Sequence, residues 1–379
     1  MSTGTASFGL VSEYGGRAPA LDRLVADLRL NAGGEARLAE RLVGAVAAWR
    51  RPLRIQVTGR AGAGKSTLLR ALALMSAEET APVDEPGRPD PLLDGDLVVY
   101  VLAAAPQPAD RAVLATLPRE RTLVVLNKAD AIGSRWADAV GAAERCARDF
   151  GVPVLPVVAE LAARTRTGTP TEDDLRTLRR HADHADSSFT LSPELFVSAA
   201  AGSDTAERQA VLDRWGRYGV ACALTALRHE PRLGAQPLLR LLHAVSGIDA
   251  VHTQLHHRYQ QMAAQRGGDL LDELARLAAA AIPDATGGRG RARDLIEDYL
   301  AGDEALGLGL HAGLACPQVR HLAAGYPATE PSDADDALAR AQRWRAVVSS
   351  DMPAPARRAA IRVHNGYVRI WERMSSAGL

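Results

Sequence analysis

The chain has 379 residues, of which 47% are hydrophobic and 24% charged, and its acidic and basic residues balance to a net charge of zero. A chain of this length can form two or three domains with a sizeable core, and the composition is that of a globular protein. The neutral charge and the 4% content of aromatic residues argue against nucleic acid as a partner, because such binding relies on basic surfaces and stacking rings.

Cysteine usage and the apolar runs indicate the compartment. The three cysteines, Cys146, Cys222 and Cys316, are isolated and odd in number, which suits neither a disulfide framework nor a zinc site and is typical of a reducing environment. Residues 1–19 lack the basic start and apolar core of a signal peptide. No run reaches the roughly 18 apolar residues of a membrane span. We therefore expect a soluble, cytoplasmic protein without a transmembrane segment.

In chain order, the first expected elements are two helices within residues 18–50. Apolar residues recur there at helical spacing on either side of a break at residues 31–34. They are Leu21, Leu24, Val25 and Leu28 before the break and Leu38, Leu42, Val43 and Val46 after it.

Strands and helices alternate over residues 51–202. The strand candidates are the short apolar runs 53–58, 97–102, 122–126 and 152–158. Continuous apolar runs separated by helix-sized stretches predict an α/β fold with a mostly parallel, buried sheet. Residues 161–190 are polar and are interpreted as an insertion, in which the His181–Asp186 run is a loop rather than a metal site. The short apolar segment 195–197 follows.

From residue 203 onward the pattern is helical. Leucine and alanine recur at helical spacing over residues 206–228, 236–265, 269–281, 291–301, 333–349 and 354–374. No fixed-period repeat is present, so a solenoid is not favoured. We therefore expect three parts: an N-terminal helical segment (1–50), an α/β domain (51–202) and a large C-terminal all-α domain (203–379).

A P-loop pattern, G-x-x-x-x-G-K-[ST], is matched by residues 59–66, between a strand candidate and a helical run. Glycines in such a loop let successive backbone N–H groups surround phosphates, and the following helix N-terminus adds its partial positive charge. By this chemistry Lys65 bridges the β- and γ-phosphates and the Ser66 hydroxyl binds Mg²⁺. The alternative is a glycine-rich turn that binds nothing. The predicted nucleotide-binding residues are Gly59, Arg60, Ala61, Gly62, Ala63, Gly64, Lys65, Ser66 and Thr67.

A second motif, N-K-A-D at residues 127–130, follows the apolar run 122–126 and fits the N-K-x-D guanine signature. The Asp130 carboxylate can accept hydrogen bonds from the N1 and N2 positions of guanine, and adenine lacks these donors. Only two of the 45 basic residues are lysines, Lys65 and Lys128, and each lies inside one of the two motifs, where arginine would not substitute. The predicted base-binding residues are Asn127, Lys128 and Asp130.

With both motifs in place, the region resembles the G domain of the translation-factor-related P-loop GTPases, nearest the Era-like and bacterial dynamin-like branches. The Gly59-Arg60 opening of the loop is similar to the Era-like P-loop. The resemblance implies a P-loop NTPase fold, GTP or GDP as ligand and Mg²⁺ as cofactor.

GTPases of this class also carry a D-x-x-G motif that contacts the γ-phosphate, and residues 84–87 fit it. The resemblance implies that Asp84 holds Mg²⁺ through water and that the Gly87 N–H contacts the γ-phosphate. The alternative is a Pro-Gly turn in a polar loop, because residues 81–83 make a poor strand.

The interval before this motif is shorter than in the family. Only sixteen residues lie between Thr67 and Asp84, which leaves room for a short loop and at most one strand. Thr80 is the one candidate for the Mg²⁺-binding threonine of the family, and Arg88 stands where a glutamine would orient water. The sequence therefore supports nucleotide binding better than hydrolysis.

The segment that reads guanine O6 through a backbone N–H has two candidates. Ala159, within residues 158–160, has the usual distance from N-K-x-D but lacks the usual serine. Residues 198–200 read Ser-Ala-Ala, the usual sequence, but follow the polar stretch. Spacing favours Ala159.

The helices suggest how nucleotide state is used. Dynamin-like proteins flank the G domain with helices that transmit nucleotide state, and residues 246–251 before a long helix resemble bacterial members. The sequence shows no basic amphipathic segment with exposed aromatic residues, so membrane remodelling is not favoured. His252 and His256 are interpreted as part of a polar helix face. We expect a GTP-binding switch, or a hydrolysis-deficient scaffold or regulatory subunit of a partner GTPase, that meets a protein partner or other copies through its helices. An ATP-dependent enzyme would require the N-K-A-D motif to be accidental.

Overall fold

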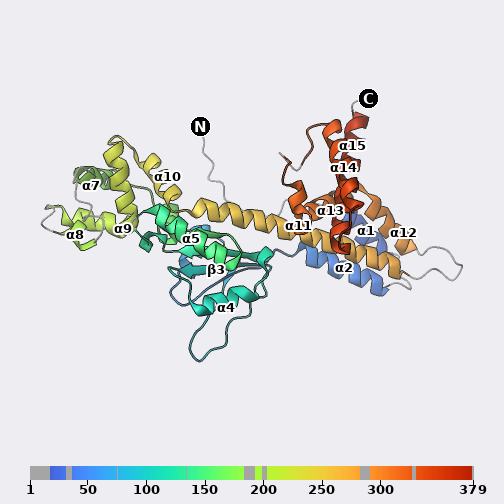
Figure 1. Cartoon of the computed structure of the whole chain (residues 1–379), viewed down its shortest axis with the longest axis horizontal. Helices are drawn as coiled ribbons and strands as arrows, with labels where there is room; N and C mark the ends of the chain where they lie inside the picture. Colours follow the sequence, from blue (N-terminus) through green and yellow to red (C-terminus); the bar gives the residue numbers. More distant parts are fainter. Residues whose placement is uncertain are drawn as a thin grey trace. The chain divides into compact units, whose positions relative to one another are not determined.

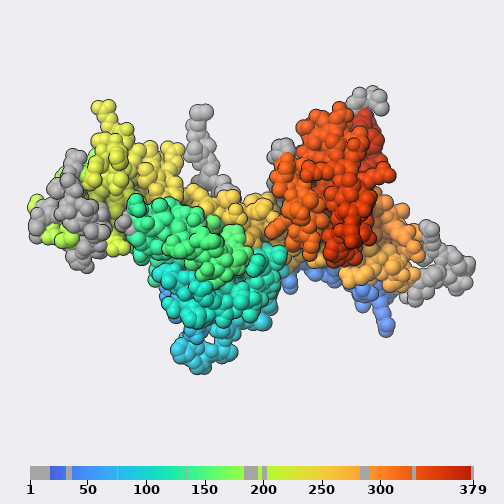
Figure 2. Space-filling model, in the orientation of Figure 1, coloured from blue at the N-terminus to red at the C-terminus, as the bar shows by residue number. Residues whose placement is uncertain are grey.

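The computed structural model describes residues 18–30, 36–74, 76–133, 135–182, 193–198, 203–281, 291–326 and 330–377. Their contacts divide the chain into two compact units, drawn in Figure 1 and Figure 2. The sheet unit is Arg54–His257, and the helical unit combines the residues up to Leu53 with Arg258–Leu379. Each unit has its own hydrophobic core.

The sheet unit is built on five parallel strands in the order β2-β1-β3-β4-β5. The strands are β1 (Ile55–Thr58), β2 (Ala77–Glu79), β3 (Leu97–Ala103), β4 (Thr122–Asn127) and β5 (Val154–Pro156). Every residue of β1 and β4 is buried, as in parallel strands covered on both faces. Four strands match the predicted apolar runs, and the α/β architecture with a parallel sheet is confirmed.

The fifth strand, β2, lies at the edge of the sheet beside β1. Its three residues are half-buried or exposed, so no apolar pattern marks it in the sequence. It is the one strand between Thr67 and Asp84 in the described part of the chain, in agreement with the limit set by the length of that interval. Part of the segment between β2 and β3 projects from the unit (Figure 2).

Helices cover the sheet. They include α3 (Lys65–Leu72), α4 (Pro108–Thr116), α5 (Trp136–Phe150) and α6 (Ala159–Thr167). The face of β3 that carries Val98, Tyr100 and Leu102 packs against apolar residues of α4 and α5. Helix α3 contacts β1 and packs against α6. Alternate residues of a buried strand therefore pack against different layers of helices.

The described part of the polar stretch 161–190, interpreted from the sequence as an insertion, is mostly helical. It holds the end of α6 and all of α7 (Glu172–Ala182). The composition of α7 is polar, yet Leu175, Leu178 and Ala182 form a narrow stripe at helical spacing that is buried against α9. His181, predicted in a loop, is buried in α7 with Nε2 2.9 Å from Asp204 Oδ2. Residues 183–192 lie outside the described residues.

Three further helices belong to the sheet unit, and they gather at one end of it (Figure 1). These are α8 (Pro193–Val197), α9 (Thr205–His229) and α10 (Ala235–Val245). The last two lie within the C-terminal domain expected from residue 203 onward, whereas the contacts place them with the sheet. The reason is their apolar face, which packs with Val158, Leu161 and α7 in one cluster.

Helix α11 (Ile248–Ala280) begins in the sheet unit, and its residues from Arg258 belong to the helical unit. The helix predicted over residues 236–265 is thus divided into α10 and α11, because Gly247 adopts a left-handed conformation (φ 76°) between them. The helical run expected over residues 269–281 continues the same helix, α11. Gly268 stays helical, and a Cβ there would lie 3.0 Å from the Ala312 side chain, so the small residue permits close helix packing.

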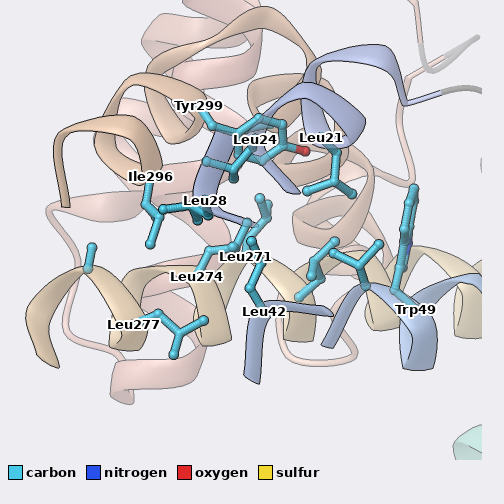
Figure 3. Close-up of a cluster of buried hydrophobic side chains, with 14 of the residues drawn as sticks. Leu21, Leu24, Leu28, Leu42, Trp49, Leu271, Leu274, Leu277, Ile296 and Tyr299 are labelled. Carbon is cyan, nitrogen blue, oxygen red and sulfur yellow. The ribbon is translucent and has the colours of Figure 1, made fainter. Parts of the chain in front are cut away.

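The helical unit contains α1 (Pro19–Leu30), α2 (Ala36–Arg50), α12 (Arg291–Ala301), α13 (Asp303–Ala315), α14 (Ala334–Val348) and α15 (Ala354–Ala377). Figure 3 shows one of its cores, to which α1, α2, α11 and α12 contribute. Leu21, Leu42, Leu274 and Ile296 are fully buried there. The two N-terminal helices and their apolar positions are confirmed.

A second cluster joins α13, α14 and α15 around Trp344 and Tyr367, which are 1% and 0% exposed. A Cβ at Gly313 would lie 2.6 Å from the Ala359 carbonyl oxygen, so α13 and α15 approach closely only because that residue is glycine. None of the helices in the described ranges combines the length and apolar character needed to cross a membrane.

Candidate functional site

The glycine loop, residues 59–64, follows β1 at the carboxyl edge of the sheet. The chain places β2 on one side of β1 and β3 on the other, so the loop lies at the switch point where open parallel sheets bind ligands. The first hydrogen bond within α3 runs from the Leu68 amide to the Gly64 carbonyl (2.9 Å). The amides of the three residues before Leu68 are therefore helix N-terminal donors, which favour an anion.

Lys65 folds back over this loop. Its Nζ donates to the carbonyls of Gly59 (3.1 Å) and Arg60 (3.3 Å), and the residue is 6% exposed. Burial lowers the pKa of Lys65, while the negative charges of Glu79 and Glu85 act to raise it. The ammonium group is thus held against the main chain that the phosphates are expected to contact.

Glu79, which sequence analysis did not single out, lies beside Ser66. The Ser66 hydroxyl donates to Glu79 Oε1 at 2.9 Å. Glu79 is the last residue of β2, and the parallel pairing of β2 with β1 brings it to the same edge as the glycine loop. Mg²⁺ bound with phosphates needs only one or two carboxylates, so this hydroxyl and carboxylate are a fitting ligand pair. The described residues hold no cluster of three His, Cys, Asp or Glu side chains suited to a metal ion.

The D-x-x-G segment lies next to the glycine loop. Val83 pairs with Arg60 in parallel register, and the Val83 amide donates to the Gly59 carbonyl at 3.2 Å. Asp84 follows in a left-handed conformation (φ 60°), and its amide donates to Asp90 Oδ1 at 2.8 Å. Asp84 therefore lies at the edge of the glycine loop.

Gly87 lies in a tight turn. The Arg88 amide donates to the Glu85 carbonyl at 3.1 Å, and Gly87 has φ 80°, which is the pattern of a type II turn with Pro86 and Gly87 at its centre. This is the geometry that the alternative reading, a Pro-Gly turn, predicts. A turn here does not by itself bring the Gly87 amide to a phosphate.

Thr80 is engaged within the sheet. Its Oγ1 lies 2.8 Å from Thr58 Oγ1 and 2.9 Å from the Ala81 carbonyl oxygen. Its amide donates to the Val57 carbonyl at 3.1 Å. The hydroxyl proposed for Mg²⁺ thus joins the ends of β1 and β2.

A buried carboxylate, Asp110, anchors the glycine loop from α4. Asp110 is 1% exposed and accepts from Arg60 Nε (3.1 Å), Tyr100 Oη (2.8 Å) and the Gln107 amide (2.7 Å). Burial raises the pKa of Tyr100, and its hydrogen bond to Asp110 adds to the rise. These contacts hold the Arg60 side chain against the sheet and restrain the start of the loop.

Asn127 links the two predicted motifs. It is 4% exposed, and its Nδ2 donates to the Ala63 carbonyl of the glycine loop at 2.9 Å. Its Oδ1 accepts from the Ala159 amide at 3.1 Å. Gly64 must remain glycine for this contact, because it has φ 93° and a Cβ there would lie 2.3 Å from Asn127 Nδ2.

The two candidate O6-reading segments lie in different surroundings. Ala159 starts α6 beside Asn127, as its hydrogen bond shows. Ser198 instead lies against α9, where its carbonyl accepts from Arg208 Nη2 at 3.1 Å. Residues 199 and 200 lie outside the described residues.

A pocket of about 300 Å³ opens beside the N-K-A-D motif. Asp130, in the short turn η2 (Ala129–Ala131), lines it together with Trp136 of α5. Arg217 and Tyr218 of α9 line it as well. Lys128, in a left-handed conformation (φ 59°), is exposed between Asn127 and this turn.

No protein-family model matches the chain, and no curated protein matches it.

Proposed function

We propose that the chain is a GTP-binding protein of the P-loop GTPase type, which binds Mg²⁺ with the nucleotide and passes its nucleotide state to its helices. The observation that carries the proposal is the pair of hydrogen bonds made by the side-chain amide of Asn127. This amide joins the glycine loop, at Ala63, to Ala159, which starts α6 after residues 157–158, here called the third loop. A loop suited to phosphates and a loop suited to a base thus share one side chain at the carboxyl edge of a parallel sheet.

The assignment of roles follows from which donors and acceptors are used. The helix N-terminal amides and Lys65 suit the phosphates, and Ser66 with Glu79 or Asp84 suits Mg²⁺. Asp130 suits the N1 and N2 donors of guanine. Since the Ala159 amide already donates to Asn127, we assign the O6 contact to the next amide of α6, that of Glu160.

Slow or partner-stimulated hydrolysis fits the structure better than fast turnover. The segment between α3 and β3 holds one short strand in the described residues, and the Thr80 hydroxyl is engaged with Thr58. The same observation favours a second candidate, a hydrolysis-deficient GTP- or GDP-binding scaffold or regulatory subunit. Phosphate release measured over hours, with the protein alone and with a candidate partner, separates the two.

A direct contact supports coupling to the helices. The Val158 amide, next to Ala159, donates to the Ser246 carbonyl at 2.8 Å, and α11 starts two residues later. A displacement of the third loop on nucleotide exchange would therefore act on the first turn of a 33-residue helix. The helices are the surfaces that we expect to meet a protein partner or another copy.

Isothermal titration of the full chain with GTP, GDP and ATP in Mg²⁺ tests the guanine assignment. We expect GTP to bind more tightly than ATP and Asp130→Ala to weaken GTP binding by about 10- to 100-fold, because hydrogen bonds to a carboxylate are lost. Asp149→Ala is the matched control: its carboxylate pairs with Arg111 on the exposed surface and lies outside the site. Equal affinities for GTP and ATP in the unaltered protein would refute guanine specificity.

A further inference from the structure

We infer that helix α9 completes the base site, with Arg217 and Tyr218 forming a wall against the guanine ring whose edge is read by Asp130. The inference rests on the proposed function and adds recognition residues to it. The pocket beside Asp130 has a volume of about 300 Å³, at the lower end of small-molecule sites. Its lining comes from the N-K-A-D turn, the start of α5 and α9.

The chemistry of the lining suits a flat ring with a donor edge. Asp130 supplies an acceptor, while Trp136, Tyr218 and Arg217 supply two aromatic rings and a planar cation. Nucleobases stack on aromatic rings and on guanidinium planes, and a carboxylate pairs with the N1 and N2 donors of guanine. Adenine has no donor at N1 and no amino group at C2, so it would leave the carboxylate without partners.

Helix α9 is bent where these residues begin. Gly216 has φ 68° and ψ 168°, which is outside the helical region, and Arg217 and Tyr218 follow it directly. The bend changes the direction of α9 just before the helical turn whose residues line the pocket. Tyr218 is held from behind, because its hydroxyl donates to the Val245 carbonyl at the end of α10 (3.4 Å).

The pKa of Tyr218 is consistent with Asp130 lying close to α9. Burial raises the pKa of Tyr218, and the negative charge of Asp130 adds to the rise. Burial likewise raises the pKa of Cys222, one turn further along α9, to about 11, with a hydrogen bond from Tyr218 acting in the opposite direction. Cys222 does not line the pocket, but it directly follows Ala221, which does, and it lies beside Tyr218.

The test compares GTP with inorganic tripolyphosphate, which carries phosphates and no base. We expect Arg217→Ala and Tyr218→Ala to bind GTP about tenfold or more weakly and to bind tripolyphosphate with unchanged affinity, measured by titration calorimetry in Mg²⁺. Arg240→Ala on α10 is the matched control, since Arg240 is exposed and does not line the pocket. Unchanged tripolyphosphate binding shows that the variants retain the folded site.

A second measurement uses Cys222 in a Cys146→Ser, Cys316→Ser background. We expect GTP to slow the alkylation of Cys222 and tripolyphosphate to leave the rate unchanged. The inference is overturned if Arg217→Ala and Tyr218→Ala bind GTP as tightly as the unaltered protein and GTP does not slow the alkylation of Cys222. In that case the proposal that the chain binds GTP still stands. If the unaltered chain binds GTP no better than tripolyphosphate, the proposed function itself fails.

Discussion

At the scale of single residues, the two lysines of this chain have different surroundings. Lys65 is buried and bonded to the carbonyls of the glycine loop, and burial lowers its pKa. Lys128 is exposed after the buried Asn127. A slim stem suits the first position, because an arginine fork could not satisfy the same two carbonyls within the loop.

Glu79 provides a prediction at this scale. If Ser66 and Glu79 both hold Mg²⁺, Glu79→Gln should weaken GTP binding about tenfold in the presence of Mg²⁺ and leave it unchanged or slightly stronger in EDTA. The physical reason is that the amide keeps the shape of the side chain but is a poorer ligand for a hard cation. The same measurement on Asp84→Asn, at the other candidate carboxylate, shows which of the two carboxylates contributes more to Mg²⁺ binding. Equal dependence on Mg²⁺ in Glu79→Gln and in the unaltered protein would remove Glu79 from the metal site.

Glu79 could not be found from a local pattern. The residues of β2 are Ala, Glu and Glu, and an edge strand of this kind has no apolar side chain to mark it. Its role depends on its pairing with β1, which brings the carboxylate to Ser66. Asn127 was identifiable because an apolar strand precedes it, although its two hydrogen bonds depend on tertiary structure.

At the scale of elements, the turn between α10 and α11 is a tightly constrained connection of the sheet unit. Gly247 has φ 76°, and a Cβ there would lie 2.6 Å from the Pro156 carbonyl oxygen and 2.9 Å from the Trp136 ring. Trp136, the first residue of α5, lines the proposed base pocket, and Pro156 ends β5 shortly before Ala159. The turn is therefore a point at which α11 and the site meet.

Gly247→Ala should consequently affect both stability and binding. We expect a loss of roughly 1–3 kcal/mol in the free energy of unfolding, because a left-handed residue gains a side chain against fixed backbone. GTP binding should also weaken, as the 156–159 segment is displaced. Gly234→Ala is the control, since its backbone is extended (φ −84°) and the nearest atom to an added Cβ lies at 3.9 Å. Normal GTP affinity in a destabilised Gly247→Ala protein would show that the turn does not act on the site.

The helices of residues 159–182 show how burial overrides composition. Glu172–Ala182 is dominated by charged residues, which suggests a loop when composition alone is considered. A stripe of Leu175 and Leu178 is enough for a helix once α9 covers it, because packing of one face supplies most of the stability of a helix in a protein.

At the scale of the whole molecule, each unit has its own core. Leu274 is fully buried in the helical unit among residues of α1, α2 and α12 (Figure 3). Leu274→Ala should lower the free energy of unfolding by about 2–5 kcal/mol, through lost burial and the cavity left behind. The GTP affinity of the remaining folded protein should not change, because the residues that we propose to contact the base and the phosphates belong to the sheet unit.

Leu30→Ala is the matched control for this substitution, since Leu30 is 84% exposed and the same atoms are removed. It should alter stability by no more than about 0.5 kcal/mol. Chemical denaturation followed by circular dichroism, together with GTP titration of both variants, measures the two effects. If Leu274→Ala binds GTP more weakly under conditions in which it is fully folded, the core of the helical unit acts on the site.

The sequence by itself determined the alternating strands and helices, the helical character of both ends and the two motifs that contain the lysines. These features are local: a buried parallel strand is a continuous apolar run, and a glycine loop must directly join a strand to a helix. Tertiary structure alone decided the pairing of β2 with β1, the bridge that Asn127 makes and the place of α9 and α10 in the sheet unit. Those features depend on contacts between segments far apart in the chain, where the partner surface determines which side chain is buried and which atom is within reach.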